Sequence, residues 1–181
     1  MNFIEDYFLS IVGNKSPLKK IENFNESMLY DFYQQLNFNS HDLLIVLEEL
    51  LINCVEHGQS DTTFYFDKKF DIHTFAVCDS GQGIHTTVPK NINLKDIKGK
   101  SSTSIIRLSL EEGITGTSKI GRGMGLHYLS KLVSQKNATA LISSNSGLVI
   151  QQGDYFSEKK LNFEIAGNII ILQIHKKELG L

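Results

Sequence analysis

The chain has 181 residues, of which 41% are hydrophobic and 21% are charged, a composition that suits one folded domain and excludes a disordered tail. Eighteen lysine and arginine residues against 20 aspartate and glutamate residues give a net charge of −2, which argues against a dedicated nucleic-acid-binding protein. No apolar run is long enough to span a membrane, no secretory signal is visible, and two cysteines make no disulfide framework. We therefore expect a soluble, cytoplasmic protein with neither a nucleic acid nor a membrane as partner.

Helices are predicted in the first third of the chain. Apolar residues recur at helical spacing over residues 3–12, and a second short helix is predicted around residues 28–36. The strongest helical pattern covers residues 41–56, with Ser40 or Asn39 as its N-cap. Apolar residues occupy more than one face of this helix, so we expect it to be largely buried.

After this helix the pattern becomes that of strands. Residues 62–66 and 72–78 are separated by a polar turn at residues 67–69 and predict a β-hairpin. The stretch that follows is polar and irregular, apart from a helix predicted over residues 102–112. Another helix is predicted over residues 126–133.

The end of the chain is typical of several strands, at residues 138–142, 148–151 and 169–174, with a weaker one at 161–165. Because helices and strands do not alternate strictly, the pattern favours an α+β layered fold. We expect residues 1–38 to form an N-terminal helical segment that packs on or extends a domain of residues 39–181.

A polar stripe lies on the long predicted helix. Glu49, Asn53 and His57 are each four positions apart, so they project from nearly the same face, and Gly58 follows. Buried polar groups are costly unless they have partners, so this stripe needs an explanation. One explanation is structural, a solvated face with a C-terminal cap at Gly58.

A second polar cluster follows the predicted strand at residues 72–78. Asp79 is followed by Gly81, Gly83 and Ile84, and glycines at this spacing allow a sharp turn and the close approach of a ligand. Asp79 could accept a hydrogen bond from an exocyclic amine. The alternative is a strand that ends in a polar glycine turn.

A third cluster is the glycine-rich run from Gly121 to Leu126, which leads into a helix. Backbone N–H groups in such a loop, together with a helix N-terminus, favour anion binding. The run is not a dinucleotide-binding fingerprint, because Leu126 stands where the third glycine would be. Nor is the Gly99–Ser101 segment a P-loop, because Leu94 occupies the position of its first glycine.

Taken in order, the three motifs read E-x-x-x-N-x-x-x-H-G, D-x-G-x-G-I and G-x-G-x-G-L. In order and spacing they resemble the ATP-binding boxes of the GHKL (Bergerat-fold) superfamily, over roughly residues 39–174. Within it, the chain looks most like the small stand-alone ATPase domains of anti-sigma-factor serine kinases. The resemblance implies a two-layer α/β sandwich whose sheet is mixed, mostly antiparallel, with helices on one face.

The resemblance also implies roles for single residues, with ATP and Mg²⁺ as cofactors. Asn53 would coordinate Mg²⁺, and Asp79 would receive the adenine amino group. Residues 84–120 would form a lid over the nucleotide, and Ser143 or Ser144, after the next strand, would line the adenine pocket. Gly81, Gly83 and Ile84 would contact the base, while the phosphates would meet Gly121, Arg122, Gly123, Met124, Gly125 and Leu126.

Glu49 is the candidate catalytic residue. In the hydrolytic and serine-kinase branches of the superfamily, the matching glutamate is a general base on water or on a protein hydroxyl. A carboxylate one helical turn from the Mg²⁺ ligand can face the γ-phosphate and accept that proton. The alternative is that Glu49 only orders water around Mg²⁺.

The resemblance leaves several functions open. We expect a Mg-ATP-dependent serine/threonine kinase of the anti-sigma type, with a protein partner or phosphoacceptor and a possible homodimer. The first alternative is a non-kinase ATPase switch whose lid reshapes a protein-binding surface, and the second is a binding module without turnover. A histidine kinase is disfavoured, because only about forty residues precede the Asn53 helix and no separate phosphoacceptor segment is evident.

Overall fold

The computed structural model describes residues 3–22, 26–36, 39–58, 62–88, 99–114 and 124–180. Its elements are α1 (Phe3–Val12), β1 (Lys19–Glu22), α2 (Glu26–Gln35), α3 (His41–Gly58), β2 (Thr63–Lys69), β3 (Ile72–Asp79), α4 (Ile84–Thr87), α6 (Ser102–Ser109), α7 (Gly125–Gln135), β4 (Ala138–Gln152), β5 (Tyr155–His175) and the 3₁₀ helix η2 (Lys176–Leu179).

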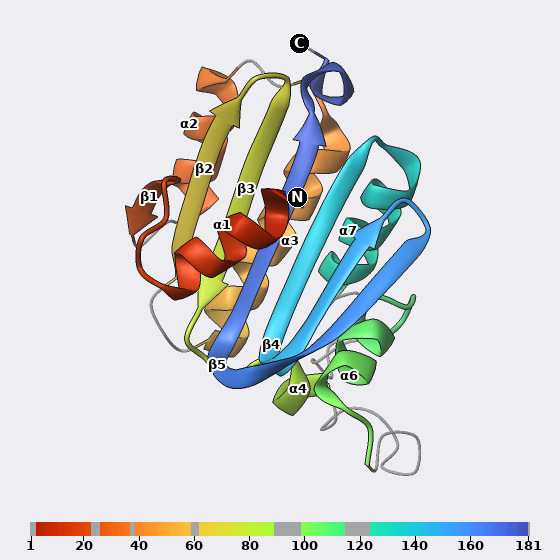
Figure 1. Ribbon diagram of the computed structural model, residues 1–181. Coiled ribbons are helices and arrows are strands. Elements are labelled where there is room, and N and C mark those ends of the chain that lie inside the picture. The colour runs from red at the N-terminus through yellow and green to blue at the C-terminus, as the bar shows by residue number, and fades with distance from the viewer. Residues whose placement is uncertain are drawn as a thin grey trace.

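The strands form one five-stranded sheet in the order β1-β2-β3-β5-β4, and each neighbouring pair is antiparallel. The fold class is therefore α+β, as predicted, and the described pairings include none of the parallel contacts that a mixed sheet would have. The long strands β4 and β5 do not run straight but double back (Figure 1). Within β4 this occurs where the register shifts between Ser144 and Gly147, and Asn145 there has a positive φ of 53°.

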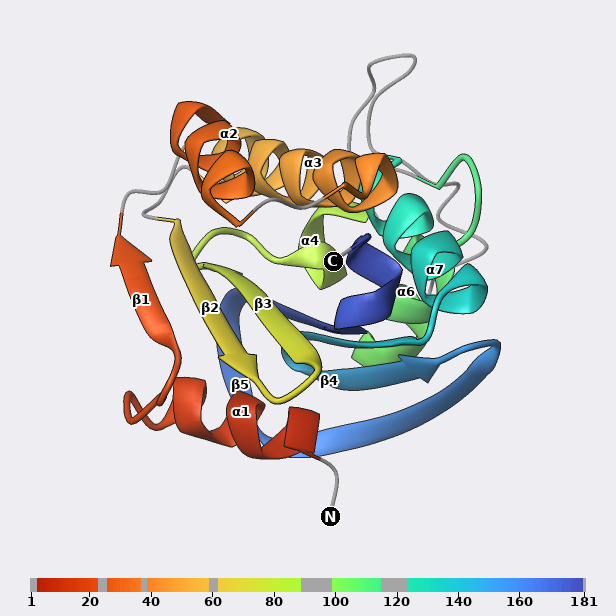
Figure 2. The same ribbon diagram turned by 90° about the horizontal axis from the view of Figure 1, so that it is seen from above.

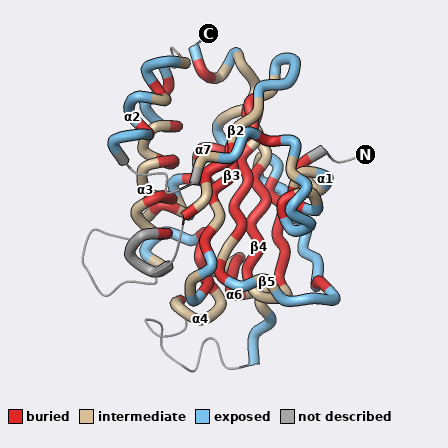
Figure 3. The backbone as a smooth tube through the Cα atoms, turned by 90° about the vertical axis from the view of Figure 1, so that its left-hand side faces the viewer, coloured by how far each residue is buried: buried red, intermediate tan, exposed pale blue. Residues whose placement is uncertain are grey.

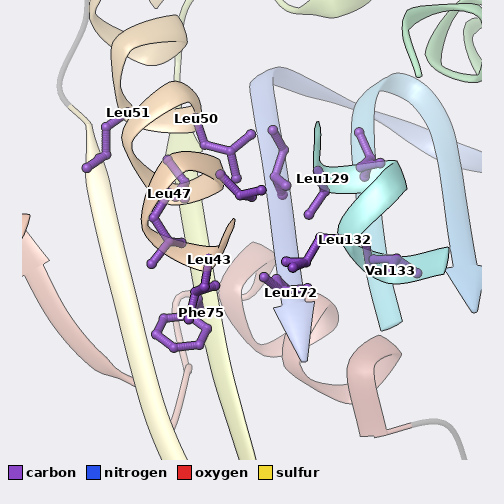
Figure 4. Close-up of a cluster of buried hydrophobic side chains, with 14 of the residues drawn as sticks. Leu43, Leu47, Leu50, Leu51, Phe75, Leu129, Leu132, Val133 and Leu172 are labelled. Atoms are coloured by element: carbon purple, nitrogen blue, oxygen red, sulfur yellow. The ribbon is translucent and has the colours of Figure 1, made fainter. Parts of the chain in front are cut away.

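Helices α2, α3 and α7 cover one face of the sheet (Figure 2). The main core lies between them and the strands, and Figure 4 shows Leu47 and Leu50 of α3, Leu129 of α7 and Leu172 of β5 converging there. Ser40 caps α3, as predicted, by accepting a hydrogen bond from the Leu43 N–H at 3.4 Å. In the described residues, no helix is long and apolar enough to cross a membrane.

Helix α1 packs on the opposite face of the sheet (Figure 2). Its apolar stripe of Ile4, Phe8 and Ile11 is buried against strand residues that include Leu141 and Ile171. The expectation of helices on one face only is therefore wrong for α1, because this stripe is too apolar to remain in water. The central part of the sheet, in β3, β4 and the second half of β5, is thus buried (Figure 3).

Several element boundaries differ from those predicted. Strand β2 continues to Lys69, so the hairpin turn lies at Phe70 and Asp71 rather than at residues 67–69. The edge strand β1 and the short helix α4 were not predicted, and α6 ends at Ser109 rather than near residue 112. The separate strands predicted after residue 138 are parts of the two long strands β4 and β5.

Candidate functional site

One end of the sheet carries a row of polar residues on three neighbouring strands. Asp79 at the end of β3 pairs with Asn168 of β5, which pairs in turn with Ser144 of β4. Side chains alternate between the faces of a strand, and Val77 lies in the core beneath α3, so Asp79 points to that same face. Asp79 is 8% exposed and Ser144 is fully buried. The row lies at the end of the sheet where α4 is found (Figure 1).

The Asp79 carboxylate accepts hydrogen bonds from three other segments. The Gly81 N–H donates to Oδ1 at 2.9 Å, which folds the chain sharply after β3. The Asn168 amide donates to Oδ2 at 3.0 Å. The Cys54 thiol of α3 also donates to Oδ2, at 3.5 Å. Asp79 is thus held in place from the helix, from the adjacent strand and from the loop that follows it.

Cys54 remains a protonated thiol in this setting. Burial raises its pKa, and the neighbouring negative charge of Asp79 raises it further. A protonated thiol can donate to a carboxylate, whereas a thiolate could not. The Cys54 contact also joins the helix that carries Glu49 and Asn53 to the strand that carries Asp79.

Glu49 and Asn53 lie against the beginning of α7. A β-carbon built on Gly125 would stand 2.9 Å from Asn53 Nδ2 and 2.9 Å from Glu49 Cβ. Real β-carbons essentially never come so close, so only glycine allows the two helices to approach in this way. The structure therefore brings Gly125 of the third sequence motif against Glu49 and Asn53 of the first. The side chain of His57, the third member of the stripe, lies outside the described residues.

Asn168 connects Asp79 to the start of α4. While its amide nitrogen donates to Asp79, its carbonyl oxygen accepts the Ile84 N–H at 2.8 Å. Gly83, just before Ile84, has a φ of +76°, and a β-carbon there would stand 2.7 Å from the Ser144 hydroxyl oxygen. The need for glycine at this position is therefore explained by a left-handed backbone and by packing against β4.

His85 of α4 is held between two β4 residues and its neighbour on α4. The Ser144 hydroxyl donates to the Gly167 carbonyl at 3.2 Å, so it accepts from His85 Nδ1, 3.1 Å away. The other ring nitrogen then accepts from the Asn145 amide at 3.2 Å and from the Thr86 hydroxyl at 3.0 Å. This pattern requires a neutral ring, and burial lowers the pKa of His85 accordingly.

The remaining predicted residues are placed only in part. Met124 precedes α7, and Leu126 packs partly buried against the main core. Gly121, Arg122 and Gly123 lie outside the described residues, as do residues 89–98 and 115–120 of the predicted lid. The assignment of phosphate contacts and of a lid therefore stays a prediction.

The serine prediction needs correction in one respect. Ser143 and Ser144 lie within β4 rather than after a strand, and both are fully buried. The Ser143 hydroxyl donates to the Gly147 carbonyl at 2.8 Å and stabilises the reversal of β4. Of the two, Ser144 is the one that lies beside Gly83 and His85.

Sequence reasoning did not identify Asn168, Cys54 or His85 as part of this site. Asn168 follows Gly167 directly before a run of isoleucines, which resembles an ordinary turn before a strand. Its contact with Asp79 depends on strand order and register, and short sequence patterns do not give either one. The one available signal was a polar residue at the start of an otherwise apolar strand.

No family model matches the sequence, and no curated protein matches it either. Among the described residues, no group of three or more histidine, cysteine, aspartate or glutamate side chains could hold a metal ion. In the described part of the chain, α3 contacts the second motif at Asp79 and the third at Gly125.

Proposed function

We propose that this protein is a Mg-ATP-binding regulatory protein of the GHKL (Bergerat-fold) type, which transfers the γ-phosphate to a serine or threonine of a partner protein. One observation carries the proposal. Motifs that are far apart in the sequence meet at one end of the sheet, where Gly125 lies against Glu49 and Asn53, and Cys54 joins the same helix to Asp79.

The residues present suit an adenine nucleotide. Asp79 is a buried, firmly held acceptor for the exocyclic amine of the base. The N-terminus of α7, at Gly125, offers backbone N–H groups and the positive end of a helix dipole to phosphates. Helix α3 connects these two parts of the site, because its Cys54 contacts Asp79 and its Asn53 lies against Gly125.

The residues also suit Mg²⁺ held together with a nucleotide. Mg²⁺ prefers oxygen ligands and usually keeps several waters, with few ligands from protein and the rest from phosphates. The Asn53 side-chain oxygen would be such a ligand, and the carboxylate of Glu49 lies one helical turn away. The ion would neutralise charge on the phosphates.

Glu49 would act as the general base for phosphoryl transfer. Its carboxylate would accept the proton of the attacking hydroxyl as that oxygen forms a bond to the γ-phosphorus. The bond between the γ-phosphorus and the bridging oxygen breaks in the same step, and ADP leaves with that electron pair. If the hydroxyl belonged to water, the same arrangement would give an ATPase.

The proposal is tested first by binding and then by transfer. Mg-ATP should raise the melting temperature, because a ligand that binds only the folded state adds about 2.7 kcal/mol at a hundredfold excess over Kd. Asn53→Ala and Asp79→Ala should abolish the shift. With γ-labelled ATP and cell extract, the label should appear on a protein, and Glu49→Gln should prevent this while keeping nucleotide binding.

The neighbouring glutamate provides a matched control. Glu48 lies on the same helix and accepts a hydrogen bond from the Tyr30 hydroxyl at 3.2 Å, so Glu48→Gln should leave transfer unchanged. Label released only as free phosphate, and lost in Glu49→Gln, would favour the ATPase switch instead. A well-folded wild-type protein without any shift in Mg-ATP would refute nucleotide binding altogether.

A further inference from the structure

The hydrogen bonds of Asp79 leave little of its carboxylate open. A carboxylate presents about four lone-pair directions, two on each oxygen. Among the described residues, Cys54 and Asn168 both donate to Oδ2, and Gly81 donates to Oδ1. These donors use three of the four directions. The fourth lies on Oδ1, the atom against which Gly167 packs so closely that a β-carbon there would stand 2.6 Å away. Asp79 can therefore accept one N–H group, in an orientation that its protein partners set.

Cys54 is the one of these partners that belongs to the helix bearing Glu49 and Asn53. It is 3% exposed and lies on the core side of α3, one residue after Asn53. Its sulfur packs in the main core and also donates to Asp79, so cysteine adds a donor S–H group that a purely apolar side chain would lack. The S–H group is a weak donor, but its acceptor here is a charged carboxylate, which strengthens a hydrogen bond.

We propose that Cys54 is a positioning residue for Asp79, and that the preference of the site for a base with an exocyclic amine depends on the Cys54 thiol. This inference rests on the proposed nucleotide site and deepens it. With Cys54 and Asn168 both on Oδ2, the carboxylate cannot rotate to offer a different oxygen. Without the thiol, Oδ2 would have one donor fewer and the plane of the carboxylate would be held less firmly.

The test compares two nucleotides that differ only in the amine. The dissociation constants of Mg-ATP and of Mg-purine riboside triphosphate, which lacks the 6-amino group, are measured by calorimetry. The wild-type protein should prefer ATP by about tenfold or more, the usual effect of a hydrogen bond to a charged group. Cys54→Ala should reduce this preference about threefold to tenfold by weakening ATP binding, with little change for the purine nucleotide.

Two further variants separate positioning from packing. Cys54→Ser keeps a donor and should retain most of the preference for ATP. Cys78→Ala is the matched control, because Cys78 directly precedes Asp79 but packs against the core on the opposite face of the sheet. It should leave the preference unchanged, and melting curves of all three variants establish that each is folded.

The outcomes distinguish this inference from the proposed function. A folded Cys54→Ala variant that keeps the full preference for ATP would refute the positioning role while leaving the ATP site intact. If Cys54→Ala lost affinity equally for both nucleotides, the positioning role would be refuted too, because altered packing would have that effect. A wild-type protein that binds neither nucleotide would refute the proposed function itself, and this inference with it.

Discussion

Gly125 and Glu49 lie in such close contact that a β-carbon on the glycine would stand 2.9 Å from the Glu49 β-carbon and 3.4 Å from its carbonyl carbon. The start of α7 is thereby pressed directly onto the backbone of α3. The position of Glu49 and Asn53 relative to the N-terminus of α7 is therefore set by the absence of a side chain.

Gly125→Ala should destabilise the protein by about 1–3 kcal/mol, because the backbone and β-carbon of Glu49 cannot move aside easily. It should also weaken Mg-ATP binding, since α7 must shift away from Asn53. Chemical denaturation and calorimetry measure the two effects. Gly113→Ala is the control: its β-carbon would meet open space, so only the left-handed φ of +79° is strained. It should cost about 1 kcal/mol and leave nucleotide affinity unchanged.

Asn168→Asp should make the stability strongly dependent on pH. The change keeps the size of the side chain and its acceptor for the Ile84 N–H, but it places a second carboxylate where the amide donates to Asp79 at 3.0 Å. Two adjacent carboxylates repel when both are ionised, so the variant should be less stable than the wild type at pH 7. The difference should shrink as the pH falls towards 4 and one carboxyl becomes protonated. Parallel curves of melting temperature against pH would contradict this contact.

His73 should make the folded protein less stable in acid. Its ring is fully buried, and burial, followed by the charges of Lys68 and Lys176, lowers its pKa from 6.5 to about 4. Because the folded-state pKa lies below the unfolded value, the stabilisation is present above pH 6.5 and is lost as the pH falls towards 4. The loss amounts to at most about 3 kcal/mol. Urea denaturation between pH 7 and 4.5 should show it, and His73→Gln should give a flatter curve.

The contact between Tyr7 and Asp67 should anchor α1 to the sheet. The Tyr7 hydroxyl donates to Asp67 Oδ2 at 2.6 Å, and burial together with this carboxylate raises the pKa of Tyr7 to about 12. Tyr7→Phe should cost about 1.5–3 kcal/mol, the range for a hydrogen bond to a charged group. In the wild type, this stabilisation is complete below pH 10 and should be lost as the pH rises towards 12.

Denaturant titrations of the two proteins at pH 8 measure the cost of Tyr7→Phe. Tyr155→Phe serves as the control, because Tyr155 is 86% exposed and its hydroxyl should contribute less than 0.5 kcal/mol. Equal stability of Tyr7→Phe and the wild type would mean that α1 is held by its apolar contacts alone.

Much of the fold could be predicted from local patterns. The α3 helix has a long apolar pattern and a clear N-cap, and both strands of the β2–β3 hairpin are rich in β-branched and aromatic residues. Strand β1 was missed because its sequence, Lys-Lys-Ile-Glu, has a single apolar residue. It forms by pairing with β2 at the sheet edge, a long-range contact that no local pattern gives.

The hairpin turn was misplaced for a different reason. Asp67 and the lysines after it are turn-like residues by type, yet they pair with β3, while Phe70 adopts the left-handed conformation at φ 55°. A phenylalanine in that conformation is rare, so sequence statistics argue against it. Likewise, the apolar stripe of α1 predicts a helix with one buried face, but it cannot tell which face of the sheet it covers.

In the site, too, local patterns identify some residues, whereas others depend on long-range contacts. Glu49, Asn53, Asp79 and Gly125 are recognisable because their spacing within each motif is regular. Their partner Asn168 could not be found in this way, since it reaches Asp79 from 89 positions further along the chain. Residues that contribute chemistry leave local signatures, whereas residues that hold them in place depend on the register of distant strands.

Because both faces of the sheet carry a core, substitutions on the two faces should have different effects. Successive residues of β3 serve different cores: Val77 faces α3 and the candidate site, while Ala76 faces the core beneath α1. Substitutions beneath α1 can thus raise or lower stability, while the sheet separates them from the candidate site. We therefore expect substitutions beneath α1 to affect the proposed nucleotide site less than substitutions on the other face, and a library of variants should be most tolerant there.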